Sequence, residues 1–260
     1  MSVLHTIPGA LSRATVIKRP SATIKSPYVA DIQLDDGTVG LCHTPGLGCC
    51  GLVEANKKIY VCRSRPGSKT QYTAHIAECA DESGAYYVGI HPMITQAAAQ
   101  NLLHLISPIA SWESEVTIEE HTRIDYVGTL PTGKRIYVEV KTAMASMKTN
   151  VDRSVRKAVF PEGYRKKIID TVSPRAVKHA EVLAERMKMP DTEACVLLYI
   201  VPRMDCPAGL DINPGDPIYC AAVRNAVRQG VAARAFSLSY SVDGTICLGR
   251  ELPVYVNLSQ

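Results

Sequence analysis

The chain has 260 residues with a formal net charge of +4, and 46% of its residues are hydrophobic while 21% are charged. This length allows one large domain or two ordinary ones, and the apolar content is sufficient for packed cores, which argues against global disorder. No apolar run approaches the roughly 18 residues that a membrane span requires, so the sequence excludes an integral membrane protein.

The nine cysteines are scattered and form no CxxC pair. We therefore expect reduced thiols in an intracellular, cytoplasmic protein and no disulfide framework. Cys42, His43, Cys49 and Cys50 lie close together, but their spacing fits no common zinc pattern. The first ten residues also lack the basic start and apolar core of a signal peptide.

The first 90 residues predict β structure. Alternating segments separated by turn signals, such as Asp35-Asp36-Gly37, give expected strands at 14–17, 28–34, 38–43, 58–64, 72–78 and 86–90. Short strands with tight turns and little helix are typical of a small barrel, of which the oligonucleotide-binding (OB) barrel is one form.

Beyond residue 90 the pattern becomes mixed α/β. Helices are expected at 93–106, from Ser173-Pro174 to 189, and at 217–229. Strands are expected at 115–119, 123–130, 134–142, 194–201, 231–241 and 245–248. The unbroken apolar run 194–201 predicts a strand that is buried on both faces and covered by helices. The sequence thus divides into domains 1–90 and 91–260.

A candidate site lies on the predicted hairpin of strands 123–130 and 134–142. Glu139 and Lys141 alternate with Val138 and Val140, so they share one face, and Asp125 lies on the neighbouring strand. Two nearby carboxylates repel each other and suit Mg²⁺ (or Mn²⁺), which takes one or two protein carboxylates together with phosphate and water. A lysine beside them can offset charge on a phosphate, which indicates phosphodiester hydrolysis.

A second interpretation of the same residues is structural. Charges on an amphipathic hairpin often form cross-strand ion pairs of little energetic value, and Glu-x-Lys is a weak string. The surrounding Ile, Val and Tyr residues and the adjacent buried strand favour the site.

Positive charge is concentrated between Lys148 and Lys178, where nine cations face three acids and give +6, so the rest of the chain sums to −2. We expect this segment to contact nucleic-acid phosphates, because such contacts supply most non-specific affinity. The expected contacts there are Arg153, Arg156, Lys157, Arg165, Lys166, Lys167, Arg175 and Lys178. In the barrel, Arg63, Arg65 and Lys69 border a loop that could follow a backbone. His179 is interpreted as a packed or exposed helix residue without a catalytic role, and the alternative for all these cations is a solvated surface.

Several short motifs spread over residues 11–256 carry a resemblance to a known family. They are Tyr28-Val-Ala-Asp-Ile, His43-Thr-Pro45, Thr122-Arg-Ile-Asp125, Tyr137-Val-Glu139-Val-Lys141, Phe160-Pro161-Glu162, Ser173-Pro-Arg175, Lys178-His179 and Glu251-Leu-Pro-Val. With these motifs the chain resembles the sugar fermentation stimulation protein A family, whose members pair an OB-type barrel with a domain similar to the PD-(D/E)xK nucleases.

The resemblance implies that Asp125, Glu139 and Lys141 match the nuclease-like core motif, and that Glu115 matches a further acidic position that could serve a metal. It also implies a DNA-binding role linked to sugar use. The family's His-Cys-Pro-Asn-Thr-Gly stretch is His43-Thr-Pro-Gly-Leu-Gly48 here, so its asparagine and threonine are missing.

Two functions follow from the sequence. The first is a DNA-binding protein of low sequence specificity with a divalent-metal-dependent hydrolytic site. The second is a DNA-binding regulator that uses the same fold without cleavage. A small phosphorylated ligand in the carboxylate pocket is a weaker third reading.

Overall fold

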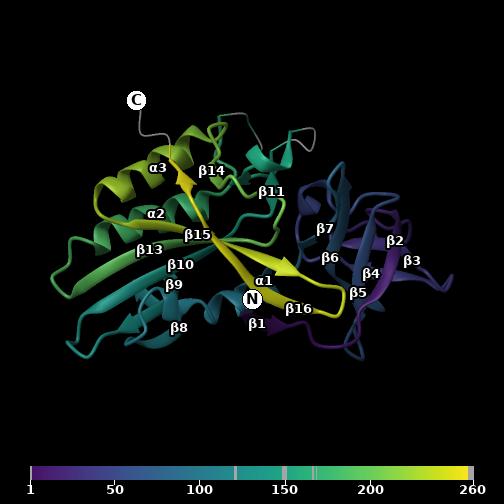
Figure 1. Ribbon diagram of the computed structural model, residues 1–260, viewed down its shortest axis with the longest axis horizontal. Helices are drawn as coiled ribbons and strands as arrows, with labels where there is room; N and C mark the ends of the chain where they lie inside the picture. The colour runs from purple at the N-terminus through teal and green to yellow at the C-terminus, as the bar shows by residue number, and fades with distance from the viewer. Residues whose placement is uncertain (1, 120–121, 148–150, 166, 168, 257–260) are drawn as a thin grey trace.

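The computed structural model describes residues 2–119, 122–147, 151–165, 167 and 169–256. The chain forms a ring of strands on the right of Figure 1 and a larger layered unit on the left. No helix among the described residues is long and apolar enough to cross a membrane.

The ring contains the strands expected before residue 90. They are β2 (Ser12–Lys18), β3 (Val29–Leu34), β4 (Val39–His43), β5 (Lys58–Arg63), β6 (Tyr72–Asp81) and β7 (Gly84–Gly89). Their order in the sheet is β4-β3-β2-β5-β6-β7. A parallel pairing of Cys42 with Tyr72 and His43 with Thr73 joins β4 to β6 and closes the sheet on itself. The inward-facing side chains, including Val16, form a core of their own.

A seven-stranded sheet forms the centre of the larger unit. Its order is β1 (Val3–Thr6), β16 (Thr245–Leu252), β15 (Ala232–Tyr240), β13 (Thr192–Val201), β10 (Arg135–Thr142), β9 (Thr122–Thr129) and β8 (Ser111–Glu119). Strands β10, β13 and β15 are parallel, and their neighbours on either side are antiparallel. A small second sheet has the order β11 (Ala145–Ser146), β12 (Ala158–Phe160), β14 (Leu210–Ile212) and β17 (Val254–Tyr255).

Among the described residues, three α-helices and three short 3-10 turns complete the fold. The helices are α1 (Pro92–Gln100), α2 (Pro174–Arg186) and α3 (Pro217–Arg228), and the turns are Gly48–Gly51, Leu103–Leu105 and Arg153–Val155. The expected start of α2 is confirmed, because Ser173 Oγ accepts from the Ala176 amide at 3.2 Å and proline follows it.

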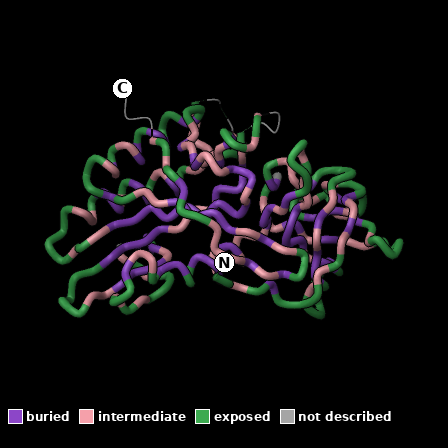
Figure 2. The backbone as a smooth tube through the Cα atoms, viewed as in Figure 1, coloured by how far each residue is buried: buried purple, intermediate pink, exposed green. Residues whose placement is uncertain are grey.

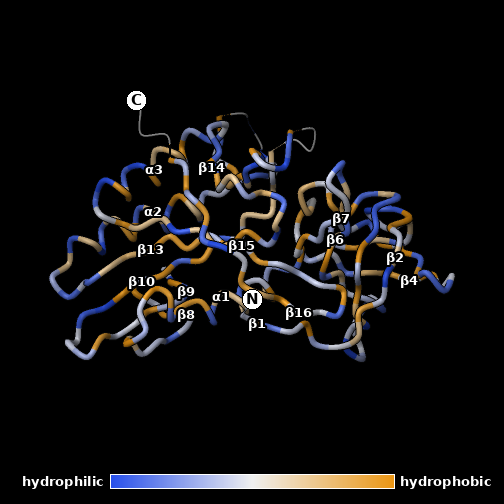
Figure 3. Tube along the Cα trace, in the orientation of Figure 1, coloured by the Kyte–Doolittle hydropathy of each residue, from blue (hydrophilic) through white to orange (hydrophobic). Residues whose placement is uncertain are grey.

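The sheet is buried on both faces, as Figure 2 shows for its central strands. Leu197 and its same-face neighbours pack against α2 and α3. Leu198 faces the other way, into a core that includes α1 and the ring residues Cys62 and Ile76. Figure 3 shows the apolar residues gathered along these central strands, and the hydrophilic ones on the outer turns.

The mixed α/β class agrees with the expectation, with two differences. The second face of β13 is covered by α1 together with the ring of strands, where the sequence analysis expected helices. In addition, Val3–Thr6 lies outside the ring, although it falls within the expected domain 1–90, and it pairs with β16 of the larger unit. Its alternation is too short to have revealed a strand.

Candidate functional site

Strands β9 and β10 bring Asp125 and Glu139 together at the point where the two strands separate. Their ladder ends at the pair Val138 and Tyr126. One residue further on, Asp125 Oδ2 accepts a 2.7 Å hydrogen bond from the Val140 amide. The carboxylate therefore replaces a backbone acceptor, while β10 continues its parallel pairing with β13. Both acids are thus positioned by the central, buried strands of the sheet.

Glu139 is held by two basic side chains. It is 2% exposed, and its Oε1 accepts from Lys141 Nζ at 2.5 Å and contacts His179 Nδ1. Burial opposes ionisation, but the hydrogen bond from His179 and the charge of Lys141 bring the pKa of Glu139 below its usual value. Glu139 Oε2 is buried and has no hydrogen-bond partner among the described residues. One oxygen is therefore fixed, and the other remains available to a ligand.

The pKa of Asp125 is shifted in the opposite direction from that of Glu139. Burial and then the negative charge of Glu139 raise the pKa of Asp125 to about 6. Gln96 of α1 donates Nε2 toward Asp125 Oδ1 at 3.3 Å and toward Glu115 Oε1 at 3.5 Å. Ionising Asp125 beside Glu139 is thus unfavourable unless a positive charge lies between them.

The structure brings together the three residues Asp125, Glu139 and Lys141 that the sequence predicted. Glu115 lies at the margin: its side chain is 46% exposed and pairs with Arg123 at 2.7 Å. Sequence reasoning missed Gln96, which carries no recognisable signal. It also interpreted His179 as a packed or exposed helix histidine without a catalytic role.

His179 is indeed packed, being 4% exposed, but it contacts Glu139 and lies 3.2 Å from Lys141 Nζ. Its place on the buried face of α2, with Ala176, Ala180 and Leu183, could have directed attention to it.

The described residues contain no group of three or more His, Cys, Asp and Glu side chains placed to hold a metal ion. A pair of carboxylates is nevertheless a sufficient protein contribution for Mg²⁺, which keeps water and phosphate among its ligands. The unpartnered Glu139 Oε2 and the raised pKa of Asp125 both fit a cation at this place.

Two of the predicted phosphate contacts lie beside these acids. Arg175 and Lys178 are exposed on the first turns of α2. Together with Arg123 and His179 they line a cavity of about 650 Å³. Because His179 also contacts Glu139, the cavity and the acidic pair share one side chain.

The prediction that Arg156 contacts a nucleic-acid phosphate is wrong, because the side chain is buried. Its guanidinium is 2% exposed and pairs with Asp81 at 2.9 Å and Asp205 at 2.8 Å. Arg153 also pairs with Asp81, at 2.6 Å, and remains partly exposed. These arginines connect the ring to the larger unit, and a run of positive charge in the sequence does not show such distant partners.

The other predicted contacts vary in their surroundings. Lys157 lies 3.8 Å above the Tyr255 ring and 3.5 Å from Asp211, and Arg165 donates to the Gly215 carbonyl at 2.6 Å. Lys167 is exposed, whereas Lys148 and Lys166 lie outside the described residues. In the ring, Arg63, Arg65 and Lys69 are all exposed.

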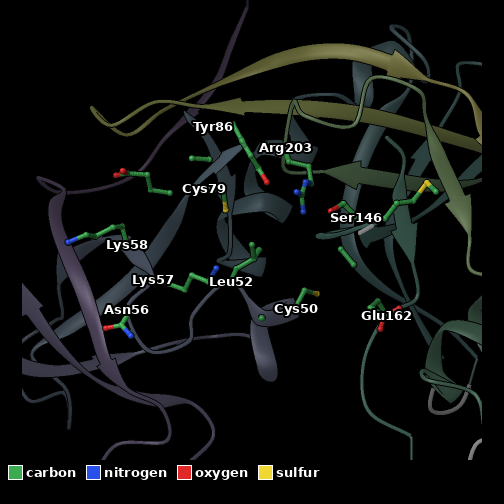
Figure 4. Close-up of a pocket in the computed structure, with 15 residues that line it drawn as sticks. Cys50, Leu52, Asn56, Lys57, Lys58, Cys79, Tyr86, Ser146, Glu162 and Arg203 are labelled. Atoms are coloured by element: carbon green, nitrogen blue, oxygen red, sulfur yellow. The ribbon is translucent and has the colours of Figure 1, made fainter. Parts of the chain in front are cut away.

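A further cleft of about 890 Å³ lies between the ring and the larger unit. Figure 4 shows Lys57, Cys79 and Tyr86 on one side and Ser146 and Glu162 on the other, with Arg203 close to the Tyr86 hydroxyl. Arg203 is buried and bound to Asp205 at 2.7 Å. The largest of these cavities is therefore separate from the acidic pair.

The fold and site define a mixed α/β protein with a buried carboxylate pair and a lysine at the end of adjoining strands. A family model described as the sugar fermentation stimulation protein RE domain matches residues 90–244, and the chain belongs to this family. The "Sugar fermentation stimulation protein homolog" of Rhodospirillum centenum is 29% identical over 91% of this chain and 94% of its own. The homolog of Nitrosococcus oceani is 28% identical, over 88% and 92%.

A solved structure described as Pyrococcus furiosus SfsA in complex with Ca²⁺ has the same fold. It superposes with a TM-score of 0.76 at 19% identity and covers 98% of this chain and 100% of its own.

Proposed function

We propose that this protein binds DNA and hydrolyses phosphodiester bonds with a divalent metal, Mg²⁺ or Mn²⁺, at Asp125 and Glu139. The observation that carries the proposal is the buried, unpartnered Glu139 Oε2 beside an aspartate whose pKa is raised by burial and by the charge of that same glutamate. A cation between the two acids would give Glu139 Oε2 a partner and would stabilise the ionised form of Asp125. In this proposal the larger unit is of the PD-(D/E)xK type and the closed ring of strands is an OB-type barrel.

The side chains around the acids would have distinct roles. Lys141 and His179 hold Glu139 Oε1, and the Val140 amide and Gln96 hold the two oxygens of Asp125, so both carboxylates are oriented. The bound metal would supply an activated water and offset negative charge. Lys141 Nζ, 2.5 Å from Glu139 Oε1, would stabilise charge on the phosphate oxygens.

Nucleic acid is the proposed substrate because cations flank the acidic pair. Arg175 and Lys178 on α2 would hold phosphates, aided by the partial positive charge at the start of the helix. These contacts carry no base information, so we expect weak sequence specificity. The reported Ca²⁺ complex of Pyrococcus furiosus SfsA, a protein with this fold, supports a divalent cation here.

The test is a cleavage time course on end-labelled single- and double-stranded DNA with Mg²⁺ or Mn²⁺ against EDTA. We expect metal-dependent cutting in the wild type and a loss of at least about a hundredfold in Glu139→Gln and in Lys141→Ala. Lys188→Ala is the matched control for lysine removal, because Lys188 is exposed at the far end of α2 and pairs with Glu185.

Binding without cutting in every metal would favour the alternative, a DNA-binding regulator that uses the same fold. In that case Glu139→Gln should bind DNA as the wild type does, and the hydrolytic role of the acids would be wrong.

A further inference from the structure

A groove of about 750 Å³ lies where the ring of strands meets the start of α1. Its lining includes three histidines from three elements: His43 at the end of β4, His75 on β6 and His91 just before α1. His43 belongs to the His-Thr-Pro stretch that the hydrolytic site leaves unused. The groove is distinct from the cavity beside His179 and from the cleft of Figure 4.

The imidazoles of His75 and His91 form a flat, uncharged stack. Their ring centroids are 4.8 Å apart and their planes differ by 9°. Burial, with the neighbouring His91 as a smaller cause, lowers the pKa of His75 to about 4, and burial together with His43 lowers the pKa of His91. At neutral pH the rings of His75 and His91 therefore carry no charge.

The stacked histidines also contain buried nitrogen atoms that lack hydrogen-bond partners in the described part of the chain. His75 is 6% exposed, and the Nδ1 atoms of His75 and His91 are both buried without a hydrogen-bond partner among the described residues. Burying an unsatisfied nitrogen is unfavourable, and a Phe or Leu would fill the same space without that cost. Packing alone therefore does not account for two histidines at this place.

Positive charge lines the same groove. Arg63 and Arg65, from the end of β5 and the loop after it, are exposed, and the Arg63 guanidinium lies 5.7 Å from the centre of the Tyr72 ring. Flat uncharged rings beside arginines form the combination that binds a nucleotide: a base stacks on the rings and its phosphate pairs with the guanidinium groups.

Helix α1 connects the groove to the acidic pair. Pro92, Met93 and Ile94 of this helix line the groove, and one turn further on Gln96 reaches Asp125 at 3.3 Å. A strand lying in the groove would therefore be led along α1 toward the carboxylates.

We propose that this groove binds an unpaired nucleotide of the DNA strand, with its base against His91, which His75 backs, and its phosphates on Arg63 and Arg65. The inference rests on the proposed function and deepens it by naming single-stranded or frayed DNA as the preferred substrate. An unpaired base is required because both faces of a base within a duplex are covered by its neighbours. A metal is the poorer choice, since no suitable group of ligands exists among the described residues.

The first measurement is fluorescence anisotropy with a labelled twelve-nucleotide oligothymidine and a blunt hairpin duplex, in EDTA so that nothing is cut. For Arg63→Ala/Arg65→Ala we expect affinity for the single strand to fall at least about tenfold, and its salt slope to fall by about 1.4, as for two lost phosphate contacts. Duplex affinity should change less. The charge-matched control, Lys134→Ala/Lys188→Ala, removes two exposed lysines far from the groove and should stay within about twofold.

The second measurement is photo-crosslinking of the same oligonucleotide carrying 4-thiothymidine, with the adducts located by mass spectrometry. Adducts on residues 62–75 or 91–94 would support the groove. Wild-type affinity in the arginine variant, or adducts confined to Lys57 and Lys58 in the cleft of Figure 4, would overturn the groove while leaving DNA binding intact. No binding of either DNA form by the wild type would instead overturn the proposed function, and this inference with it.

Discussion

At the scale of single residues, the site is defined by two acids whose pKa values are shifted in opposite directions. Glu139 is kept ionised by His179 and Lys141, whereas burial and the charge of Glu139 hold a proton on Asp125 up to a pKa of about 6. A proton and a metal ion therefore compete for Asp125.

This competition predicts the pH dependence of metal binding. Above pH 6 Asp125 is mainly ionised and available, so Mn²⁺ affinity should be nearly constant, and below pH 6 it should fall by up to about tenfold per pH unit. Calorimetric titration of the protein with Mn²⁺ at pH 7.5, 6 and 5 measures this change in affinity. Asp125→Asn should bind weakly at every pH, and Asp243→Asn, in an exposed hairpin, should behave as the wild type. An affinity that is flat from pH 7.5 to 5 would argue against Asp125 as a ligand.

The sequence predicted this acidic pair because strand alternation is a local property. Glu139 and Lys141 are two residues apart, and the hairpin supplies Asp125. Arg156 shows where local reasoning fails: its partner Asp81 is 75 residues away, so the charge run in the sequence looked like a free surface. Gln96 is unrecognisable for the same reason, because its contact with Asp125 exists only once α1 has packed on the sheet.

At the scale of elements, two helices that follow the same sequence rule differ in what their caps hold. Ser173 caps α2 through one hydrogen bond to the Ala176 amide. Asp216 caps α3 by accepting from the Tyr219 amide at 3.1 Å, and its other oxygen accepts from the Val172 amide and the Thr171 hydroxyl, both at 2.8 Å. Asp216 thus also fixes the loop that leads into α2.

The two caps should therefore differ in their contribution to stability. Ser173→Ala removes one cap bond and should lower the free energy of unfolding by about 1 kcal/mol. Asp216→Ala leaves three donors without their acceptor in a buried place and should cost about 3 kcal/mol. Urea denaturation followed by circular dichroism measures both variants. Equal losses would mean that Asp216 does not hold the loop before α2.

Strand β13 and the start of α2 were predicted, the helix expected at 93–106 ends at Gln100, and strands of two or three residues were not predicted. The eight-residue apolar run gave β13, and Ser173-Pro174 gave the start of α2. Strands β11 and β17 have two residues each, and β12 and β14 have three. Such segments have no measurable period, and only pairing with distant partners makes them strands.

At the scale of the whole molecule, the ring of strands is attached to the larger unit by an apolar core and by a buried ionic cluster. Cys62 and Ile76 of the ring pack into the core beneath β13. Beside it, Asp81 of β6 binds Arg156, which shares Asp205 with Arg203.

Arg156→Met tests the attachment. It should lower the free energy of unfolding by about 2–3 kcal/mol, less than for an isolated buried pair because Asp205 keeps Arg203. Arg153→Ala removes a more exposed arginine from the same aspartate and should cost less than about 1 kcal/mol.

Urea unfolding should be followed both by circular dichroism and by fluorescence of Trp112, the single tryptophan, which lies on β8. If the cluster holds the ring in place, the two probes should coincide in the wild type and separate in Arg156→Met, since only circular dichroism reports on the ring. DNA affinity should remain within about twofold, because a guanidinium buried between two carboxylates cannot reach a phosphate. A large loss of affinity with unchanged stability would restore Arg156 to the nucleic-acid surface and remove it from the attachment.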